Sequence, residues 1–341
     1  MSKMMKGKVV LVTGGTGSIG SEIVRQSLNE GASKVVVFSR DEVKHFMMRK
    51  KFSNTRLETI VGDVRDLSSI EQAFYRFNID ILYHAAAMKH VVMCEDFPLE
   101  VVKTNILGTQ NVVDLALKYA IPRVVTISTD KAANSANVMG ACKFIAERIT
   151  LNANRVARHE QSFSCVRFGN VANSRGSVIP VYVESLLNNK PLEVTDPEVT
   201  RFIMAISEAV KLVLKATGYM RGGEIFILKM KAFKLGDLVD VIVNRIAPNL
   251  KIAKEDVKVI NSGLVTGEKL HEDLMSDMEA PRLYQLKDMY VLLPDNNING
   301  KYAALTKARF SRYSSYDTEL LSKDEIEQII QKYIEERTLI R

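Results

Sequence analysis

The sequence is poor in the residues that form cross-links or bind metals. It has 341 residues but only three cysteines, Cys94, Cys142 and Cys165, which is an odd number at irregular spacing. A disulfide framework needs paired cysteines and a zinc site needs closely spaced Cys or His ligands, so both are excluded. The five histidines are scattered along the chain without metal-ligand spacing, and no metal site is expected.

Long hydrophobic runs and basic blocks are also missing. No apolar run reaches membrane-spanning length, and the first residues, MSKMMKGKVVLV, lack the apolar segment of a secretory signal. We therefore expect a cytoplasmic protein without membrane contact. The 47 Lys and Arg residues exceed the 40 Asp and Glu residues by seven. They form no block with interleaved aromatics, so nucleic acid is not an expected partner. The net charge is that of a mildly basic soluble protein and would also favour a phosphorylated ligand.

Short β-branched runs alternate with helical patterns up to about residue 185. Strands are predicted at Lys8–Thr13, Lys34–Phe38, Glu58–Val61, Ile79–Tyr83, Arg123–Ser128 and Phe163–Phe168. Helices are predicted between them, at Ser21–Asn29, Leu67–Tyr75, Val101–Tyr119 and Asn137–Ala157. This alternation is typical of an α/β fold with a doubly wound parallel sheet, the Rossmann type.

Beyond residue 185 the predicted segments become shorter and more mixed. Helices are expected at Ser207–Thr217 and Leu235–Ile246, and a strand at Gly223–Leu228. Ser322 and Glu325 form a capping box that opens a last helix. No linker rich in Pro, Gly or Ser separates these parts. We expect residues 1–185 to form one domain and residues 186–341 a smaller mixed α/β lobe, with parts of 163–230 shared between them.

A glycine-rich segment, TGGTGSIG from Thr13 to Gly20, follows the first strand and opens a helix. Glycines there let the backbone turn tightly and approach a pyrophosphate, whose charge sits at the helix N-terminus. We expect this loop to bind a dinucleotide; a turn made only for packing is the alternative. The expected contacts come from Gly14, Thr16, Gly17, Ser18 and Ile19.

The end of the second strand predicts which dinucleotide binds. A fold that prefers NAD usually has an acid there to accept from the ribose 2′-hydroxyl. Here Ser39 and Arg40 occupy the place, which suits a 2′-phosphate and favours NADP over NAD. Lys44 adds positive charge nearby. In the alternative interpretation, Arg40 is a solvated cation and Asp41 takes the ribose.

Other cofactor contacts are expected where later strands end. Asp63 and Val64 follow the third strand, where this fold contacts the adenine. Ala85 and Ala86 follow the fourth strand and are small enough for the backbone to pass close to the cofactor. Asn105, inside the following helix, is a polar candidate.

The fifth strand delivers Ser128, Thr129, Asp130 and Lys131 at its carboxyl end, where ligands bind in open α/β sheets. Met139-x-x-x-Lys143 follows. This stretch resembles the active-site strand and helix of a short-chain dehydrogenase/reductase whose usual tyrosine has become methionine. A thioether cannot give or take a proton, whereas the added acid and amine suit elimination chemistry. An exposed turn is the alternative interpretation of Thr-Asp-Lys.

Further phrases narrow the resemblance: Ala87–Val91, Val166–Val171, Ser174–Pro180, Thr200–Phe202, Gly222–Phe226 and Gly267–Glu272. Together they are similar to the extended short-chain dehydrogenases called UDP-N-acetylglucosamine 4,6-dehydratases, of capsule, flagellar and glycoprotein sugar biosynthesis. The resemblance covers nearly the whole chain. It implies an NADP-binding Rossmann domain with the catalytic residues, a lobe that binds a UDP-sugar, and a homo-oligomer.

The resemblance also implies a reaction. Hydride leaves C4 of the sugar for NADP⁺, a base removes H5, an acid protonates the C6 hydroxyl so that water departs, and hydride returns to C6. Asp130 is then the acid and Lys131 the base, while Ser128 and Lys143 lie at the cofactor. A lysine acts as a base only when its pKa is lowered, which Lys89 and the cofactor would help to do.

Met139 cannot take the 4-OH proton, so Thr129, or a water held by Thr129 and Lys143, is the candidate acceptor. By the resemblance, Asn170 and Arg175 hold the diphosphate and uridine, and Arg201 and Glu268 come from the second lobe. A guanidinium suits a diphosphate because it can bond two oxygens. Further substrate contacts are expected from Lys89, Ser177 and Val178.

Some residues depart from the family pattern. Val92 and Ser135 stand where proline is usual, and Val265-Thr266 precede Gly267 in place of Arg-Pro. The departures favour a subfamily, with the C5-inverting class preferred. The alternatives are an enzyme that makes or processes a 5,6-ene intermediate, a nucleotide-sugar 4-epimerase or reductase, and an NADP-sensing binding protein. The epimerase needs the missing tyrosine, so Met139 counts against it.

Overall fold

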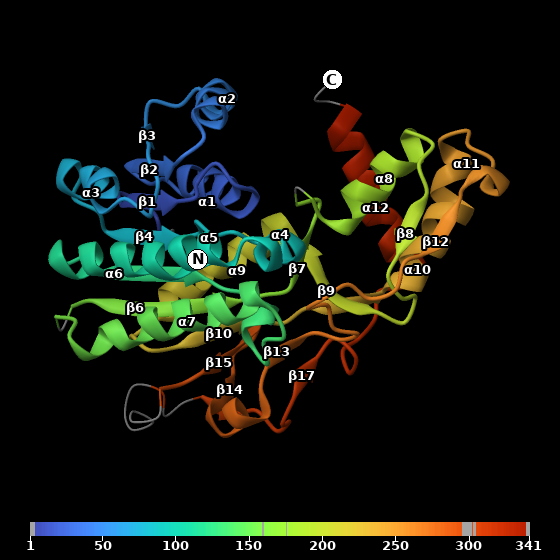
Figure 1. Cartoon of the computed structure of the whole chain (residues 1–341). Coiled ribbons are helices and arrows are strands. Elements are labelled where there is room, and N and C mark those ends of the chain that lie inside the picture. Colours follow the sequence, from blue (N-terminus) through green and yellow to red (C-terminus); the bar gives the residue numbers. More distant parts are fainter. Residues whose placement is uncertain (1–3, 159, 175, 295–301, 303–304, 339–341) are drawn as a thin grey trace.

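A large twisted sheet forms the centre of the molecule (Figure 1). The computed structural model describes residues 4–158, 160–174, 176–294, 302 and 305–338. The sheet has ten strands in the order β16-β14-β15-β10-β6-β5-β4-β1-β2-β3. Their bounds are β1 Val9–Thr13, β2 Lys34–Ser39, β3 Leu57–Val61, β4 Ile81–His84, β5 Arg123–Ile127, β6 Ser162–Arg167, β10 Ile225–Leu228, β14 Leu283–Gln285, β15 Met289–Leu292 and β16 Thr306–Lys307.

The strands from β3 to β10 in this order all pair in parallel, and β15, β14 and β16 add an antiparallel edge. The predicted doubly wound parallel sheet is therefore confirmed. Each predicted strand of the first half is present within two residues at its ends; the fourth begins at Ile81 instead of Ile79.

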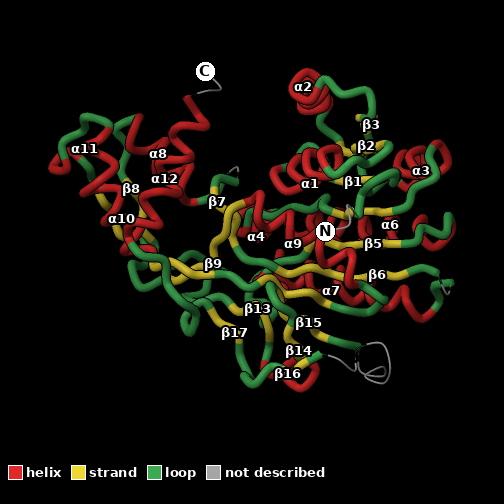
Figure 2. The backbone as a smooth tube through the Cα atoms, turned by 180° about the vertical axis from the view of Figure 1, so that it is seen from behind, coloured by secondary structure: helices red, strands yellow, loops and turns green. Residues whose placement is uncertain are grey.

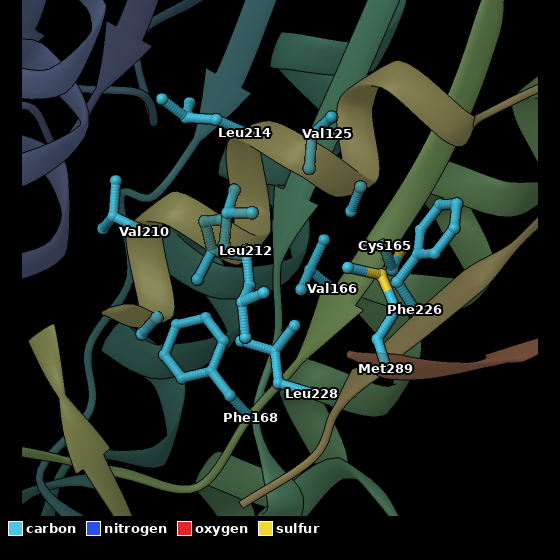
Figure 3. Packing of buried hydrophobic residues seen from close by; sticks show 14 of the residues in the cluster. Val125, Cys165, Val166, Phe168, Val210, Leu212, Leu214, Phe226, Leu228 and Met289 are labelled. Atoms are coloured by element: carbon cyan, nitrogen blue, oxygen red, sulfur yellow. The ribbon is translucent and has the colours of Figure 1, made fainter. Parts of the chain in front are cut away.

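Helices cover both faces of this sheet because its strands are apolar on both sides. In β1, Val10 and Val12 belong to the core beneath α1 (Ser18–Asn29) and α9 (Ile206–Tyr219). Leu11 points the other way, into the core beneath α3 (Leu67–Arg76) and α6 (Gly108–Lys118), as the two-residue period of a strand requires. Figure 3 shows α9 packing on the first of these cores, with Val210, Leu212 and Leu214 above the side chains of β5, β6 and β10.

Two further helices follow strands of the large sheet. The helix α2 (Glu42–Phe52) follows β2, and α7 (Val138–Asn152) follows β5. Between β4 and α6 the chain forms α4 (Val91–Asp96), α5 (Pro98–Val101) and a wider π-helical segment at Val102–Leu107. The helix predicted over Val101–Tyr119 is therefore interrupted in its first half.

Most residues beyond 170 form a smaller group beside the large sheet. It contains the three-stranded sheet β11-β9-β7, the pairs β8–β12 and β13–β17, and four helices. The bounds are β7 Asn170–Ala172, β8 Leu192–Val194, β9 Thr200–Ala205, β11 Lys231–Lys234, β12 Val259–Asn261, β13 Asp273–Met275, β17 Tyr313–Ser314, α8 Val178–Leu187, α10 Leu235–Val241, α11 Ala247–Asn249 and α12 Lys323–Thr338. In Figure 2, seen from behind, α8, α10, α11 and α12 again gather apart from β1 to β6.

Residues beyond 185 thus contribute to both parts, since α9, β10, β14, β15 and β16 join the large sheet. The domain boundary at residue 185 stays a prediction. The predicted capping box is present: the Ser322 amide donates to Glu325 Oε2 at 2.8 Å, and the Glu325 amide donates to Ser322 Oγ at 3.2 Å.

Candidate functional site

The glycine-rich loop joins β1 to α1 and fits a dinucleotide pyrophosphate. Gly14 has φ of +65°, and a Cβ there would lie 2.6 Å from the amide nitrogen of Ala86. A Cβ on Gly20 would lie 2.3 Å from the carbonyl oxygen of Gly14. Side chains are excluded at both positions because the loop packs closely on Ala86 and on its own backbone. This tight turn places the loop at the positive end of α1, where Ser18 and Ile19 begin the helix.

Next to this loop, a series of side-chain hydrogen bonds holds the end of β2 in place. Thr16 Oγ1 and Ser39 Oγ lie 2.9 Å apart, and Ser39 Oγ lies 2.9 Å from His45 Nε2. The Arg40 side chain is 64% exposed and 4.0 Å from the Asp63 carboxylate. This leaves its guanidinium accessible beside the loop.

The neighbours of Arg40 are more strongly engaged. Asp41 caps α2 by accepting from the Lys44 amide at 3.0 Å, and the Lys44 ammonium pairs with the same carboxylate at 2.5 Å. The Asp41 carboxylate is therefore already bound by the first turn of α2. It also neutralises the positive charge that Lys44 was expected to supply to the cofactor. Asp63 likewise holds Arg65, at 2.7 Å.

A buried histidine, which the sequence did not single out, links β4 to its neighbours. His84 Nδ1 lies 2.7 Å from Thr13 Oγ1, and Nε2 lies 2.9 Å from Thr109 Oγ1. Thr109 donates its own proton to the carbonyl of Asn105, so it accepts from Nε2–H and Thr13 donates to Nδ1. Burial, with the charge of Lys143 adding to it, lowers the pKa of His84 to about 3, and the ring is neutral.

The side chain of Asn105 binds the loop after β4, and its contact with the cofactor stays a prediction. Its amide nitrogen donates to the carbonyl of Met88 at 3.0 Å, and its amide oxygen accepts from the Met88 amide at 2.8 Å. Both ends of the side chain thus hold the loop after β4, the loop that follows Ala85 and Ala86 and carries Lys89. Val64 is buried against the helix start at Gly108.

The carboxyl end of β5 carries the acid and the amine. Asp130 is fully buried; its Oδ1 accepts from Thr129 Oγ1 at 2.7 Å and from the Lys131 ammonium at 3.1 Å. Its Oδ2 is buried without a hydrogen-bond partner among the described residues. A Cβ on Gly169 would lie 3.3 Å from this oxygen, so Oδ2 points to the end of β6.

Lys131 also contacts a carboxylate from the distant 267–275 segment. Its Nζ lies 3.3 Å from Oε1 of the buried Glu272. Burial alone would lower the pKa of Lys131, but the charges of Asp130 and Glu272 outweigh it and the pKa is raised. The expected lowering of this pKa is therefore wrong for the protein alone.

The helix α7 places Lys143 behind the same strand. Its ammonium donates to the carbonyl of Ile127, the last residue of β5, and burial lowers its pKa. Ser128 Oγ donates to Glu147 Oε1 at 2.5 Å, which directs it into α7. Met139 is buried in an apolar cluster with Cys94, Val101 and Cys142.

The predicted substrate residues lie around this edge of the sheet. Asn170 begins β7, and Ser177 precedes Val178 at the start of α8, with the Ser177 hydroxyl bonded to the carbonyl of Ser174. A Cβ on Gly176 would lie 2.6 Å from the ring of His90, so this loop packs on the one that carries Lys89. Arg175 lies outside the described residues.

The other two substrate candidates engage each other. Arg201 on β9 donates to Glu268 Oε1 at 2.7 Å and to the carbonyl of Thr200 at 2.8 Å. The 267–272 segment lies across the start of α7, where Asn137 donates to the carbonyl of Gly267 at 2.8 Å. Tertiary folding thus brings the second half of the chain against Asp130 and Lys131.

Comparison with known sequences matches residues 10–294 to the family described as "Polysaccharide biosynthesis protein". The chain belongs to this family. The predicted resemblance is therefore confirmed at family level, over most of the chain.

Known proteins that are similar in sequence to this chain carry several names. An uncharacterized membrane protein of Methanocaldococcus jannaschii is 42% identical, over 97% of this chain and 98% of the relative. UDP-N-acetylglucosamine 4,6-dehydratase (inverting) of Campylobacter jejuni strain 81-176 is 37% identical, over 96% and 98%. UDP-glucose 4-epimerase of Rickettsia canadensis is 34% identical, over 96% of each. Among the described residues, no helix is long and apolar enough to cross a membrane.

Solved structures agree with the fold. Pen from Bacillus thuringiensis has a TM-score of 0.89 and 36% identity, covering 96% of this chain and 98% of its own. The Cα path of this family member is thus close to that of a solved relative along almost its whole length.

Sequence reasoning missed three groups of this family member's site: His84, Glu272, and a buried ion cluster of Glu147, Arg167 and Glu279. Arg167 and Glu272 lie within two of the sequence motifs that carried the family resemblance. That resemblance was the only indication in the sequence that they belong to the site. Their partners are 20 to 141 residues away in the sequence, so no local pattern reveals the contacts.

Proposed function

We propose that this chain is a UDP-N-acetylglucosamine 4,6-dehydratase that uses NADP. The observation that carries the proposal is the buried Asp130–Lys131 pair at the carboxyl end of β5, beside Lys143. An acid and an amine at one place are what a removal of water needs and what a simple dehydrogenase lacks. The 37% identity to the Campylobacter dehydratase supports it.

The residues of the glycine loop and of Arg40 would hold the cofactor. Gly14 and Gly20 allow the tight turn that puts the backbone amides at the start of α1 within reach of a pyrophosphate, and the exposed guanidinium of Arg40 suits a 2′-phosphate. In such a reaction the nicotinamide cofactor supplies the position that accepts hydride from C4 and gives it back at C6. Lys143, fixed on the carbonyl of Ile127, contributes positive charge there.

Asp130 and Thr129 form a proton path that does not need a tyrosine. The Thr129 hydroxyl donates to Asp130 Oδ1 at 2.7 Å, so it can accept the 4-OH proton while passing its own to Asp130. Asp130 then carries the proton that the departing C6 hydroxyl requires. The unpartnered Oδ2, aimed at the end of β6, is the oxygen that would face the sugar. Met139 has no part in this path, because it is packed among apolar side chains.

The finer parts of the proposal are a C5-inverting outcome, a cytoplasmic homo-oligomer, and a role in polysaccharide or flagellin sugar biosynthesis. The inverting outcome is supported by the name of the Campylobacter relative. The biosynthetic role is supported by the family description.

The experiment is incubation of the protein with UDP-N-acetylglucosamine and NADP, followed by mass spectrometry. The expected product is lighter by one water. NMR of the product formed in deuterated water should show deuterium at C5 and give its configuration. An unchanged sugar nucleotide, with NADP bound, would contradict the proposal.

Variants of the two central residues test the roles. Asp130→Asn and Lys131→Ala should each lower dehydration by about a hundredfold or more, the usual contribution of a general acid or base. Both should still bind NADP, because neither residue lies in the glycine loop. Full turnover by either variant would refute the assignment of its role.

A second candidate is a UDP-sugar 4-epimerase, because the Rickettsia relative has that name at 34% identity. An epimerase has no use for the Asp130–Lys131 pair, and Met139 stands where the family resemblance predicts its tyrosine. Incubation with UDP-glucose distinguishes the two. An epimerase inverts C4 at constant mass, which NMR detects, while a dehydratase loses water from its substrate.

A further inference from the structure

Glu272 contacts the Asp130–Lys131 pair although it lies 141 residues beyond Lys131 in the sequence. Its Oε1 lies 3.3 Å from Lys131 Nζ, and Asp130 Oδ1 lies 3.1 Å from the same nitrogen. The Lys131 ammonium is therefore held between two carboxylates. Asp130 and Glu272 are only 0% and 3% exposed, so water screens these charges little.

The backbone around Glu272 is fixed, which gives its side chain a defined place. Its amide donates to Ser315 Oγ at 2.9 Å, and its carbonyl accepts from the Ser315 amide at 2.8 Å. Immediately after it, β13 pairs with β17. A carboxylate buried by such a structure costs free energy unless it is paired, so its position beside Lys131 needs a reason.

We propose that Glu272 is a positioning residue that holds the Lys131 ammonium beside Asp130, at the place where H5 of the sugar must be removed. This inference rests on the proposed dehydratase function. Glu272 acts only through Lys131; it is Asp130 and Lys131 that would touch the sugar.

The charges around Glu272 make Lys131 its main partner. Burial raises the pKa of Glu272, and the charge of Asp130 adds to this, against the opposing charges of Lys131, Arg201 and Lys269. Arg201, from β9, is 4.0 Å away and is already paired with Glu268 at 2.7 Å. The contact between Glu272 and Lys131 in turn raises the pKa of Lys131, so each charge stabilises the other.

Glu272 takes no part in the bond changes of the proposed reaction. Once the Lys131 ammonium has lost a proton to solvent, the amine takes H5 from the 4-keto sugar, so that one C–H bond breaks as one N–H bond forms. The ammonium that results is again held by Glu272.

The test compares Glu272→Gln with Glu272→Asp in the full-length protein with NADP and UDP-N-acetylglucosamine. Gln keeps the size but removes the negative charge that holds the Lys131 ammonium, so we expect kcat to fall about tenfold to a hundredfold while KM changes little. Asp keeps the carboxylate and should recover part of kcat. Exchange of H5 with deuterated water, followed by NMR, should slow in parallel with kcat, and the acidic side of the pH–kcat profile should shift.

Glu224→Gln is the matched control, because Glu224 is also a fully buried glutamate but binds Ser164 and the Gly222 amide, far along the sheet from Lys131. It should lose thermal stability yet keep the wild-type pH profile. A Glu272→Gln variant with wild-type kcat and H5 exchange would overturn the inference while the dehydratase function stands. A wild-type protein that never releases water would instead overturn the function itself.

If Glu272→Gln loses kcat only because it unfolds, its melting temperature and NADP affinity would fall as well. In that case Glu272→Asp decides the matter. A folded Asp variant with the same turnover and pH profile as a folded alanine variant at this position would show that the carboxylate is not used.

Discussion

Arg167 and Glu147 form a bidentate ion pair in the interior of the protein, with both nitrogen–oxygen distances at 2.7 Å and neither side chain exposed. On its other side, Arg167 donates to both oxygens of Glu279 at 2.8 Å. Ser128 donates to Glu147 as well, so the residue before Thr129 is anchored to the same cluster. The cluster therefore joins β6, α7 and the turn at Asp277–Arg282 directly behind the proposed reactive pair.

Breaking this cluster should destabilise the protein strongly. Arg167→Met leaves two buried carboxylates without their partner, and we expect the free energy of unfolding to fall by about 3–5 kcal/mol. Urea denaturation followed by circular dichroism measures it. Arg245→Ala, which removes surface pairs with Asp324 and Glu327, is the control and should cost less than about 1 kcal/mol. An equal fall in the free energy of unfolding of the two variants would show that burial does not make this ion cluster more stabilising than a surface ion pair.

His84 should make the fold sensitive to acid. Its pKa is about 3 in the folded protein and 6.5 ordinarily, so between these values the unfolded chain binds more protons than the native one. Its contribution is complete above pH 6.5 and is lost as the pH falls toward 3, by at most about 1.4 kcal/mol per pH unit. Urea denaturation at several pH values should show a shallower acid loss for His84→Gln, whose amide can keep both hydrogen bonds. An unchanged slope would mean that His84 is charged in the native state.

Met139 should be replaceable by another apolar side chain of similar volume. It is packed with Cys94, Val101 and Cys142, and its sulfur cannot transfer a proton. Met139→Leu should therefore keep turnover near the wild-type value and cost less than about 1.5 kcal/mol of stability. Steady-state kinetics and thermal melting measure these effects. A folded variant with strongly reduced kcat would show that the thioether itself contributes to the reaction.

Arg40 should discriminate between the two nicotinamide dinucleotides. Its exposed guanidinium is placed for a 2′-phosphate, so Arg40→Ala should weaken NADP binding about tenfold to a hundredfold, the worth of one charged hydrogen bond, and change NAD binding little. Fluorescence titration with each dinucleotide measures both affinities. Lys50→Ala, an exposed cation on α2 next to Phe46, is the control. An equal loss for NAD and NADP would rule out recognition of the 2′-phosphate by Arg40.

The sequence was sufficient for the parts of the fold that depend on local pattern. The β-branched runs around Val10, Val35 and Val124 became parallel strands because residues buried on both faces leave little choice of environment. The glycine loop was readable because Gly14 and Gly20 have no room for a side chain. The positions of Asp130 and Lys131 followed from the end of a strand.

The π-helical segment at Val102–Leu107 and the place of Asn105 were not predictable in the same way. A pattern of apolar residues predicted one continuous helix, and the side chain of Asn105 was expected to reach the cofactor. In the structure its amide binds Met88, because a buried amide must find partners wherever the fold places them, and the cofactor contact stays a prediction.

By itself the sequence determined the family, the sheet and the place of Asp130 and Lys131 at the end of a strand, since these follow from motifs and spacing along the chain. Only the tertiary structure decided the electrostatics: Lys131 has a raised pKa because Glu272 and Asp130 both contact it, and Arg167 is neutralised by two glutamates. Charges act through distance in space and through burial, and neither quantity is encoded in the separation of residues along the sequence.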